Sequence, residues 1–428
     1  MQRRKTIFQS YLKLIILSVL VAFICSLLGL SLKFLTEFFE SKVYTAAISF
    51  QKSLLILLPS IGITAIYFLR KYLFQNRKNK GITEIYKTLD QRKDHLPFFK
   101  IPSHYLNGFL TVISGGSTGV EVSTVVATAT VGNVTYEQNY TAKKYKRELV
   151  CAGVAAGVAV LFASPLAGWF FAMEVIAKKR RKSIMVSCTV SAFVAWLFIH
   201  FFESKPFFSI PIQGWNWNAI PFFLLLSLFA SVLSVYFTIL VIWIKTFFAK
   251  IHNNFIRVNS GAILVGLMLF FFPILYGDSY HGLIHLVEKA IFTQEVPFLL
   301  LIALILLKPI AASLTLGAGG DGGVFAPSIV AGAFLGLLFA SLSNHYLGTH
   351  LIVFNFVLLG AASTLSSAIF APFTAMILVS SMAPNGYDLL VPLFICCLLS
   401  RIVAQKLLPY NVYTYDFYQS KHTKVSTS

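Results

Sequence analysis

A single carboxylate interrupts a long stretch of small and apolar side chains in the first half of the sequence. Glu121 is the one acid in SGGSTGVEVSTVVATATVGN (114–133), and no Lys or Arg occurs between Lys100 and Lys143. A carboxylate in apolar surroundings is costly when charged, so its proton affinity should rise unless backbone amides solvate it. If it competes with an anion for those amides, anion occupancy becomes coupled to pH. We therefore interpret Glu121 as a gate rather than as an acid paired with a buried base.

Two glycine-rich breaks lead into apolar runs and indicate where an anion would bind. GGSTGVEVS (115–123) contains Glu121, and GAGGDGGVFAP (317–327) lies in the second half of the chain. The first N–H groups of a helix have no partner within the helix and carry partial positive charge. Two such helix starts that converge in a low-dielectric interior would hold a halide. The alternative is a glycine-rich turn used only for close helix packing.

The segments that follow these breaks resemble each other, which predicts a duplicated half. GVEVSTVVATATVG (119–132) and GVFAPSIVAGAFLG (323–336) share Gly, Val, Val, Ala and Gly at an offset of 204, and SPLAG (164–168) matches APFTA (371–375) at an offset of 207. Transporters built from repeats place their site at the repeat interface, near the middle of the membrane. The alternative is chance similarity between apolar small-residue segments.

The elements that must position these residues are membrane spans. The chain has 428 residues, of which 57% are hydrophobic and 12% charged, whereas soluble domains usually contain about 25% charged residues. Runs long enough to cross a bilayer recur along one membrane domain. They are Tyr11 to Phe39, Leu54 to Leu73, Ser183 to Phe202, Ile220 to Phe248, Ala262 to Leu275, Val296 to Leu316, Phe325 to Leu342, Leu351 to Met382 and Leu389 to Leu408.

The basic residues predict the orientation of these spans. The formal net charge is +19, and Lys and Arg cluster near the N-terminus, at 70–80, at 143–147 and at 178–182. Such clusters are typical of short cytoplasmic loops, so we expect a cytoplasmic N-terminus and no nucleic-acid partner. The first run has no clear cleavage site and is predicted to be an uncleaved span. The five cysteines lie in apolar surroundings without metal-ligand spacing, so we expect neither a metal site nor a disulfide.

Two segments between the basic clusters are each split by a break in the apolar sequence. The segment 100–143 is split by SGGSTG at 114–119, and the segment 147–178 is split by ASPLAG at 163–168. Each is expected to enter the membrane and return to the same side as a pair of half-helices. Irregular backbone at membrane depth is tolerated only where it is buried in protein or lines a wet cavity.

These residues carry a resemblance to a known family. GGVFAP (322–327) resembles the G-x-F-x-P motif of the CLC family of chloride channels and chloride/proton antiporters, and GVE (119–121) occupies the place of its G-x-E-G-P motif. PLAGWFFAME (165–174), APFTAMILV (371–379) and NVYTYDF (411–417) are similar to further segments of that family, in the same order. The match covers nearly the whole membrane core.

The resemblance implies an all-α integral membrane fold, polytopic, with two inverted repeats of tilted and broken helices. The expected organisation is a cytoplasmic segment 1–12, a membrane domain 13–417 with repeats at about 50–205 and 218–417, and a short cytoplasmic tail 418–428 without the appended regulatory domains of some relatives. It also implies a multi-pass protein of the inner cell membrane, a homodimer in the lipid bilayer, and no enzyme activity. Chloride would be the ligand and no cofactor is expected.

Carried over by position, the resemblance assigns the residues of the anion pathway. Glu121 would be the gating glutamate. The outer anion site would be lined by the amides of Val120 and Val122, and the central chloride would be held at Gly323, Val324, Phe325 and the hydroxyl of Tyr413.

Three departures from the family pattern bear on mechanism. The family's inner serine motif appears as Asn79-Lys80-Gly81-Ile82-Thr83, so Lys80 either favours anions at the inner mouth or points into the cytoplasm. Val122 and Ser123 replace the Gly and Pro that follow the gating glutamate. Val175 stands where proton-coupled members have an inner glutamate, with Glu174 one position earlier, about 100° away on a helix.

The missing inner glutamate favours a passive, channel-like or weakly proton-coupled chloride pathway. The alternatives are a chloride/proton or fluoride/proton antiporter. A cation-coupled secondary transporter is an alternative of another class, although it should offer more intramembrane acids. Lys308 is a further charge in an apolar run and is expected to face protein or water, whereas Asp321 in the glycine-rich turn either shapes the loop or repels anions.

Overall fold

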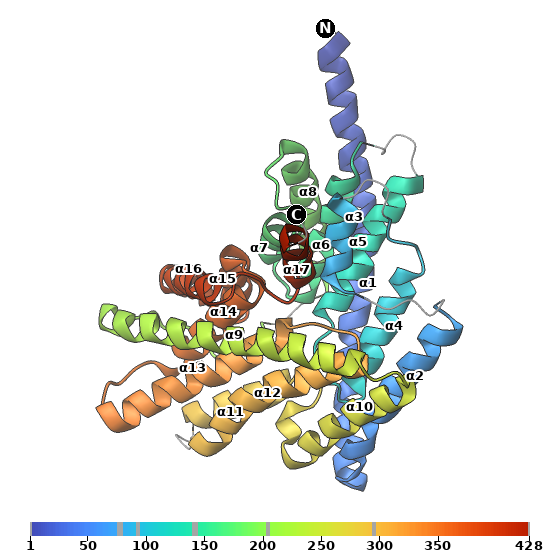
Figure 1. Cartoon of the computed structure of the whole chain (residues 1–428). Helices are drawn as coiled ribbons and strands as arrows, with labels where there is room; N and C mark the ends of the chain where they lie inside the picture. The colour runs from blue at the N-terminus through green and yellow to red at the C-terminus, as the bar shows by residue number, and fades with distance from the viewer. Residues whose placement is uncertain are drawn as a thin grey trace. The chain divides into compact units, whose positions relative to one another are not determined.

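The computed structural model describes residues 2–74, 80–90, 95–138, 144–202, 206–292 and 297–426, and these residues form helices joined by turns and loops, without a strand among them. The predicted all-α fold is confirmed (Figure 1). The helices are α1 (Gln2–Phe50), α2 (Leu54–Tyr72), α3 (Ile82–Asp90), α4 (Lys100–Ile113), α5 (Glu121–Gln138), α6 (Lys146–Leu161), α7 (Pro165–Phe171), α8 (Lys182–Phe201), α9 (Ile220–Ala249), α10 (Asn254–Phe271), α11 (Tyr280–Phe292), α12 (Phe298–Ala318), α13 (Phe325–Leu347), α14 (Val353–Ile369), α15 (Pro372–Ser380), α16 (Leu390–Leu407) and α17 (Tyr415–Ser426). A π-helix, η2 (Ala172–Ala177), continues α7, and single 3₁₀ turns lie at Trp217–Ala219, Pro273–Leu275 and Gly386–Leu389.

Within the described residues, eight helices are long and apolar enough to cross a bilayer. Their outer faces carry large apolar side chains, for example Phe229, Val232 and Trp243 on α9, which are 49%, 57% and 64% exposed. Such a continuous apolar surface suits lipid rather than water. The protein is therefore a multi-pass membrane protein, as the composition predicts.

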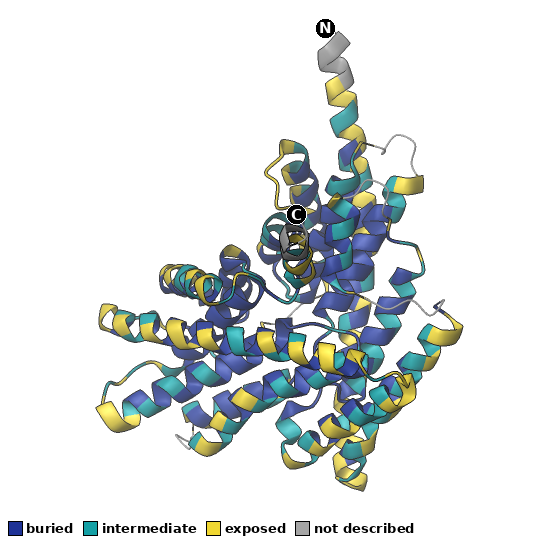
Figure 2. Cartoon of the chain, viewed as in Figure 1, coloured by how far each residue is buried: buried dark blue, intermediate teal, exposed yellow. Residues whose placement is uncertain are grey.

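The helices belong to two compact units. The first unit comprises residues 1–35, 79–106 and 121–206, and the second comprises 36–78, 107–120 and 207–428. The core of the first is the buried helix pair α5 and α6, both mostly dark blue in Figure 2. In the second unit the core is the pair α13 and α14, with 16 of the 23 residues of α13 and 16 of the 17 residues of α14 buried.

Matching glycines let the helices of each pair approach closely. A Cβ at Gly132 of α5 would lie 2.2 Å from the carbonyl oxygen of Leu149, and a Cβ at Gly336 of α13 would lie 1.9 Å from that of Phe356. The two glycines are 204 residues apart and the two carbonyls 207. The offsets that the sequence matches predict therefore recur as the same backbone contact in each unit.

The chain breaks after these pairs are also repeated. Ala163 and Phe370, again 207 residues apart, have positive φ angles of 50° and 57°. In each case the next N–H bonds back to the preceding helix, from Ser164 to Ala159 O at 2.9 Å and from Ala371 to Ser366 O at 3.2 Å. A proline then starts the next helix at its first turn, where its missing N–H costs nothing.

This second break corrects one prediction. The run from Leu351 to Met382 is not one span, because the turn at Phe370 and Pro372 divides it into α14 and α15. The predicted breaks at 114–119 and 163–168 are confirmed, and each separates two helices shorter than a full span. The expected start at Ala262 is too late, because Asn253 caps the N-terminus of α10 and the helix begins at Asn254.

Candidate anion site

Two glycine-rich turns of the second unit have the same backbone geometry. We define the first turn as residues 114–120, before α5, and the second turn as residues 319–324, before α13. Gly115 and Gly319 have φ angles of +86° and +109°, which side-chain-bearing residues rarely adopt. The next N–H returns to the preceding helix in both turns, from Gly116 to Thr111 O at 2.7 Å and from Gly320 to Thr315 O at 2.9 Å.

The two turns exchange reciprocal hydrogen bonds. The N–H of Ser117 donates to Oγ1 of Thr315 at 3.1 Å, and the N–H of Asp321 donates to Oγ1 of Thr111 at 2.9 Å. The two donors are 204 residues apart in the sequence, and so are the two acceptors. Each turn therefore donates to the threonine that precedes the other turn. A reciprocal contact of this kind relates its two partners by a local two-fold axis. The two glycine-rich breaks therefore converge, as the sequence predicts.

A glycine is required where the turns touch. Gly322 has φ +146°, and a Cβ there would lie 2.5 Å from Oγ1 of Thr118 and 3.1 Å from the carbonyl oxygen of Gly119. Oγ1 of Thr118 also donates to the carbonyl oxygen of Asp321 at 3.4 Å. The two backbones can come this close because glycine has no Cβ, as is common where backbone approaches a ligand.

Each turn delivers one of the predicted site residues to a helix start. Glu121 is the first residue of α5 and is only 4% exposed. Phe325 is the first residue of α13; no side chain caps that N-terminus, and Gly323, Val324 and Phe325 are buried. The positive end of the α13 dipole is therefore directed at a buried position with no side-chain oxygen acting as a cap, which favours a bound anion.

The other residues predicted for anion binding are buried as well. Val120 is half-buried and Val122 is 1% exposed. Tyr413 lies just before α17, is 5% exposed, and its N–H bonds to Oδ1 of Asn411 at 3.1 Å. The loop that carries its hydroxyl is thus held by an Asn side chain rather than by a regular element.

Cations surround the second turn, and sequence reasoning missed their role. Nη1 of Arg70 donates to the carbonyl oxygen of Gly319 at 2.7 Å. Asp321, which is 4% exposed, interacts electrostatically with both Arg70 and Lys245, and Lys245 also with Asp416. The sequence places Arg70 in a basic loop cluster, but it lies in the last turn of α2 and holds the second turn. The alternative that Asp321 shapes the loop is supported, because its charge is compensated.

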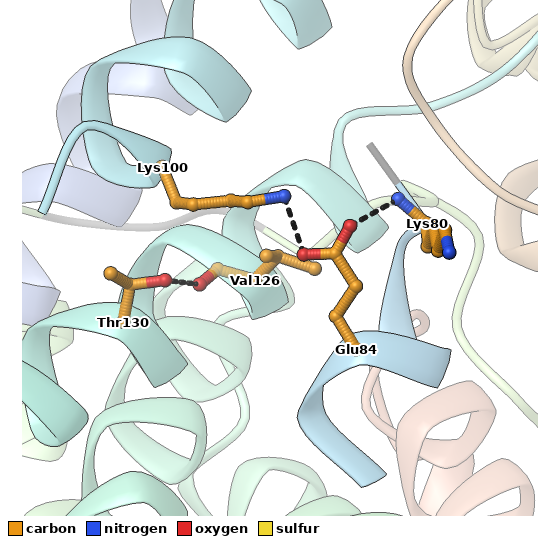
Figure 3. Close-up of polar contacts among 5 residues, drawn as sticks. All are labelled: Lys80, Glu84, Lys100, Val126 and Thr130. Carbon is orange, nitrogen blue, oxygen red and sulfur yellow. Dashed lines mark hydrogen bonds and ion pairs between the residues drawn. The ribbon is translucent and has the colours of Figure 1, made fainter. Parts of the chain in front are cut away.

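Lys80, one of the residues predicted for the inner mouth, lies beside Glu84 in the first unit (Figure 3). Lys80 is exposed, and its backbone N–H donates to Oε1 of Glu84 at 2.6 Å, while Nζ of Lys100 lies 2.5 Å from Oε2 of the same carboxylate. Gly81 has φ +61°, and a Cβ there would lie 3.3 Å from Cγ1 of Val122. The structure thus brings Gly81 next to Val122, whereas Asn79 lies outside the described residues. Ile82, at the start of α3, is fully buried.

The π-helix η2 lies where the proton-coupling glutamate is expected. Val175 is 2% exposed and Glu174 is half-buried, so the two neighbours have different surroundings. A π-turn shifts the register of a helix and often occurs at functional sites. The free cysteines are all buried, and the described residues contain no group of three metal-ligating side chains.

Comparison with known proteins identifies the family. The family model described as voltage gated chloride channel matches residues 61–405, which is most of the chain. The chain belongs to this CLC family. It is 28% identical over 426 residues to the H(+)/Cl(-) exchange transporter ClcA of Vibrio parahaemolyticus, covering 95% of this chain and 88% of the relative. The ClcA of Yersinia pseudotuberculosis is 23% identical over 409 residues, covering 92% and 84%. CLC members are anion transporters or channels and not enzymes, and none of the site chemistry requires a cofactor.

Solved structures show the same fold. A CLC-type fluoride/proton antiporter superposes with a TM-score of 0.80 at 22% identity, covering 94% of this chain and 96% of its own. A slow cyanobacterial Cl⁻/H⁺ antiporter gives 0.81 at 20% identity, covering 95% and 97%. At these identities the likeness concerns the fold.

Proposed function

We propose that the protein conducts chloride through a CLC pathway gated by Glu121. The observation that carries the proposal is the reciprocal pair of hydrogen bonds that joins the first and second turns. The amides at Gly323, Val324 and Phe325, with the hydroxyl of Tyr413, hold the central anion. Val120 and Val122 line the outer site, where the Glu121 carboxylate competes with the anion. Protonation of Glu121 removes that competition, so acidification opens the path.

We further propose that transport is passive or only weakly coupled to protons. A valine carries no proton, and buried Val175 stands where the coupled members have their inner glutamate. Chloride/proton exchange is the rival, since the similar ClcA proteins are named as exchange transporters. Fluoride/proton exchange is the other rival, since one structural neighbour has that activity in its title. Membership of the CLC family removes the cation-coupled alternative.

The arrangement in the membrane completes the proposal. The basic residues at 178–182, at the N-terminus and on α2 support a cytoplasmic N-terminus and cytoplasmic loops. The protein functions as a homodimer in the inner cell membrane, each subunit with its own pathway. Exposed Lys80 belongs to the solvated cytoplasmic surface, with Glu84 organising the turn beneath it.

Flux measurements in liposomes test this function. Purified protein is reconstituted with a chloride gradient, and chloride efflux and proton movement are recorded together. We expect chloride efflux that accelerates on acidification, with no fixed proton movement per chloride. The Glu121→Gln variant should lose the acceleration, while Glu137→Gln, an exposed acid at the other end of α5, should keep it.

Three outcomes would contradict parts of this proposal. A constant nonzero proton-to-chloride ratio would exclude passive transport. Fluoride efflux much faster than chloride efflux at equal gradients would replace the substrate. An unchanged pH dependence in Glu121→Gln would remove the gate assignment.

A further inference from the structure

A second polar site lies in the second unit, outside the residues assigned to the anion pathway. It is a cavity of about 410 Å³ between the end of α1 and the start of α11. Its lining comprises Glu40, Ser41, Tyr44, Pro273, Ile274, Tyr276, Ser279, His281, Gly282 and His285. Ser41, His281 and His285 are exposed, so the cavity reaches the surface of this unit, whereas Glu40 is only 4% exposed.

Two carboxylates meet where Glu40 lines this cavity; Asp278 is half-buried and is not among the lining residues. The backbone N–H of Asp278 donates to the Glu40 carboxylate, and the Asp278 carboxylate accepts the N–H of Tyr280 at 2.9 Å. Between them Gly277 has φ +55°, and a Cβ there would lie 1.8 Å from Oε1 of Glu40. Only glycine admits the Glu40 carboxylate at this position. The pair is therefore a built arrangement of backbone and side chains.

One buried ammonium faces the two carboxylates. Lys308 is fully buried, and its Nζ donates to Oγ of Ser279 at 2.7 Å, Oγ of Ser117 at 2.9 Å and the carbonyl oxygen of Gly277 at 3.1 Å. With both acids ionised, the three groups carry a net charge of −1. An uncompensated buried charge is costly, so such a cluster favours uptake of one positive ion. A proton added to one carboxylate brings the net charge of the three groups to zero.

The cluster is bonded directly to the first turn of the anion site. Lys308 donates to Oγ of Ser117, and that hydroxyl in turn donates to the carbonyl oxygen of Leu275 at 2.9 Å. The hydroxyl of Tyr276, in the cavity wall, donates to the carbonyl oxygen of Ile113 at 2.6 Å. The turn that leads to Glu121 is thus held just before its start, at Ile113, and at its middle, at Ser117, by residues near the carboxylate pair.

We propose that Glu40 and Asp278 form a proton-binding site, filled from the cavity, that raises the anion affinity of the pathway through Lys308 and Ser117. The inference rests on the proposed anion site and adds a second proton site to it, separate from Glu121. When one carboxylate takes up a proton, the net charge of the cluster changes from −1 to zero. The positive charge of the Lys308 ammonium is then balanced by one carboxylate instead of being exceeded by two. The potential at the first turn then becomes more favourable for a halide.

The other charged and titratable groups around the pair define the controls. Glu37 lies one turn earlier on α1 and is exposed; His281 and His285 lie on α11; Tyr44 and Tyr276 face each other with ring centroids 5.0 Å apart. Burial raises the pKa of Asp278, opposed by the N–H of Tyr280, by Lys308 and by His281. This direction favours the protonated carboxyl at a higher pH than for an exposed aspartate.

Chloride binding in a background without the gate tests the proposal. Full-length Glu121→Gln protein in detergent is titrated with chloride by calorimetry at pH 5.5 and 7.5. We expect about fivefold tighter binding at pH 5.5, the lower end of typical coupling between sites. Adding Glu40→Gln or Asp278→Asn should abolish the pH dependence and leave the affinity near its low-pH value, because the amide removes the same negative charge as the proton. Adding the control Glu37→Gln should leave the pH dependence intact.

Proton uptake gives a second measurement. Repeating the titrations in buffers of different ionisation enthalpy should show protons taken up with chloride in the Glu121→Gln protein, and none after Glu40→Gln, because linkage is reciprocal. Melting curves and size-exclusion profiles identify variants that fail to fold. Asp278→Asn and Glu40→Gln are independent changes, so if one of them fails to fold, the other tests the proposal.

Other outcomes separate this inference from the proposed function. Loss of the pH dependence in the double variant His281→Gln/His285→Gln, or a dependence on sodium when it replaces N-methylglucamine, would overturn the carboxylate site. Chloride binding with unchanged pH dependence in Glu40→Gln would do the same while leaving the anion site in place. Absence of chloride binding in every folded variant would overturn the anion site itself.

Discussion

The first and second turns share one backbone design but differ in the chemistry attached to it. Both have a glycine of positive φ, both donate an N–H to the threonine in the helix that precedes the other turn, and both lead into a buried helix. The first ends in Glu121 and is bonded to Lys308, whereas the second ends in Phe325 and is bonded to Arg70. A duplicated scaffold thus supplies the same backbone geometry twice. The residue at the helix start differs: Glu121 after the first turn can titrate, whereas Phe325 after the second cannot.

Replacing the matched glycines, Gly115 and Gly319, should reveal the largest difference in stability between the two turns. A Cβ at Gly115 would lie 2.7 Å from Cε2 of Tyr276 and 2.9 Å from Cδ1 of Leu269, whereas the nearest atom to a Cβ at Gly319 is Nη1 of Arg70 at 3.8 Å. Both alanine variants carry backbone strain of about 1 kcal/mol, and Gly115→Ala adds overpacking of about 2 kcal/mol. We expect Gly115→Ala to be the less stable of the two in denaturant titrations of purified protein. Equal losses would show that packing around the first turn is not restrictive.

The reciprocal threonines should be equivalent. Thr111→Val and Thr315→Val each leave one buried N–H, of Asp321 or Ser117, without its acceptor, which costs about 1–3 kcal/mol of unfolding free energy. Serine at the same positions keeps the hydroxyl and serves as the matched control. The losses should agree within the error of the measurement. A marked inequality would mean that the two-fold relation does not extend to the energetics.

The functional difference between the turns should appear in their pH responses. Glu121→Gln should raise chloride efflux at pH 7.5 by about tenfold and flatten its pH profile, since each factor of ten corresponds to about 1.4 kcal/mol of gating free energy. Phe325→Leu should change the rate while keeping the profile, because that side chain does not titrate. Efflux from liposomes across pH 5–8 measures both. If Phe325→Leu flattened the pH profile as much as Glu121→Gln does, Glu121 would not be the source of the pH response.

The smallest expected effect is a pH dependence of the free energy of unfolding that comes from Asp278, beside Lys308 and the first turn. Burial raises the pKa of Asp278, so the folded state binds this proton more tightly than the unfolded state. The free energy of unfolding should therefore increase as the pH falls through the raised pKa, and Asp278→Asn should lose that increase. Melting temperatures of both proteins between pH 7.5 and 5 test the sign. A wild-type melting temperature that falls in parallel with the variant would contradict it.

Much of the fold and part of the site were predictable from residue types. Span lengths, the breaks at 114–119 and 163–168, and the repeat offsets follow from apolar patterning and from Gly and Pro, whose backbone preferences are local. The break at Phe370 was missed because the run from Leu351 to Met382 is uncharged and largely apolar, although the match of APFTA (371–375) to SPLAG (164–168) indicated it. Ala163 and Phe370 both adopt positive φ without being glycines, and apolar patterning does not reveal such residues.

The sequence by itself determined that this chain is a membrane protein of the CLC family, that its halves are duplicated, and that Glu121 is an isolated acid beside a helix start. Only the tertiary structure decided that the two turns exchange hydrogen bonds, that Arg70 holds the second turn, and that Lys308 joins Glu40 and Asp278 to the first. Glu40 and Asp278 are 238 residues apart in the sequence. Local patterns report what a residue prefers, whereas the charge balance of a buried cluster depends on which distant segments the packing brings together.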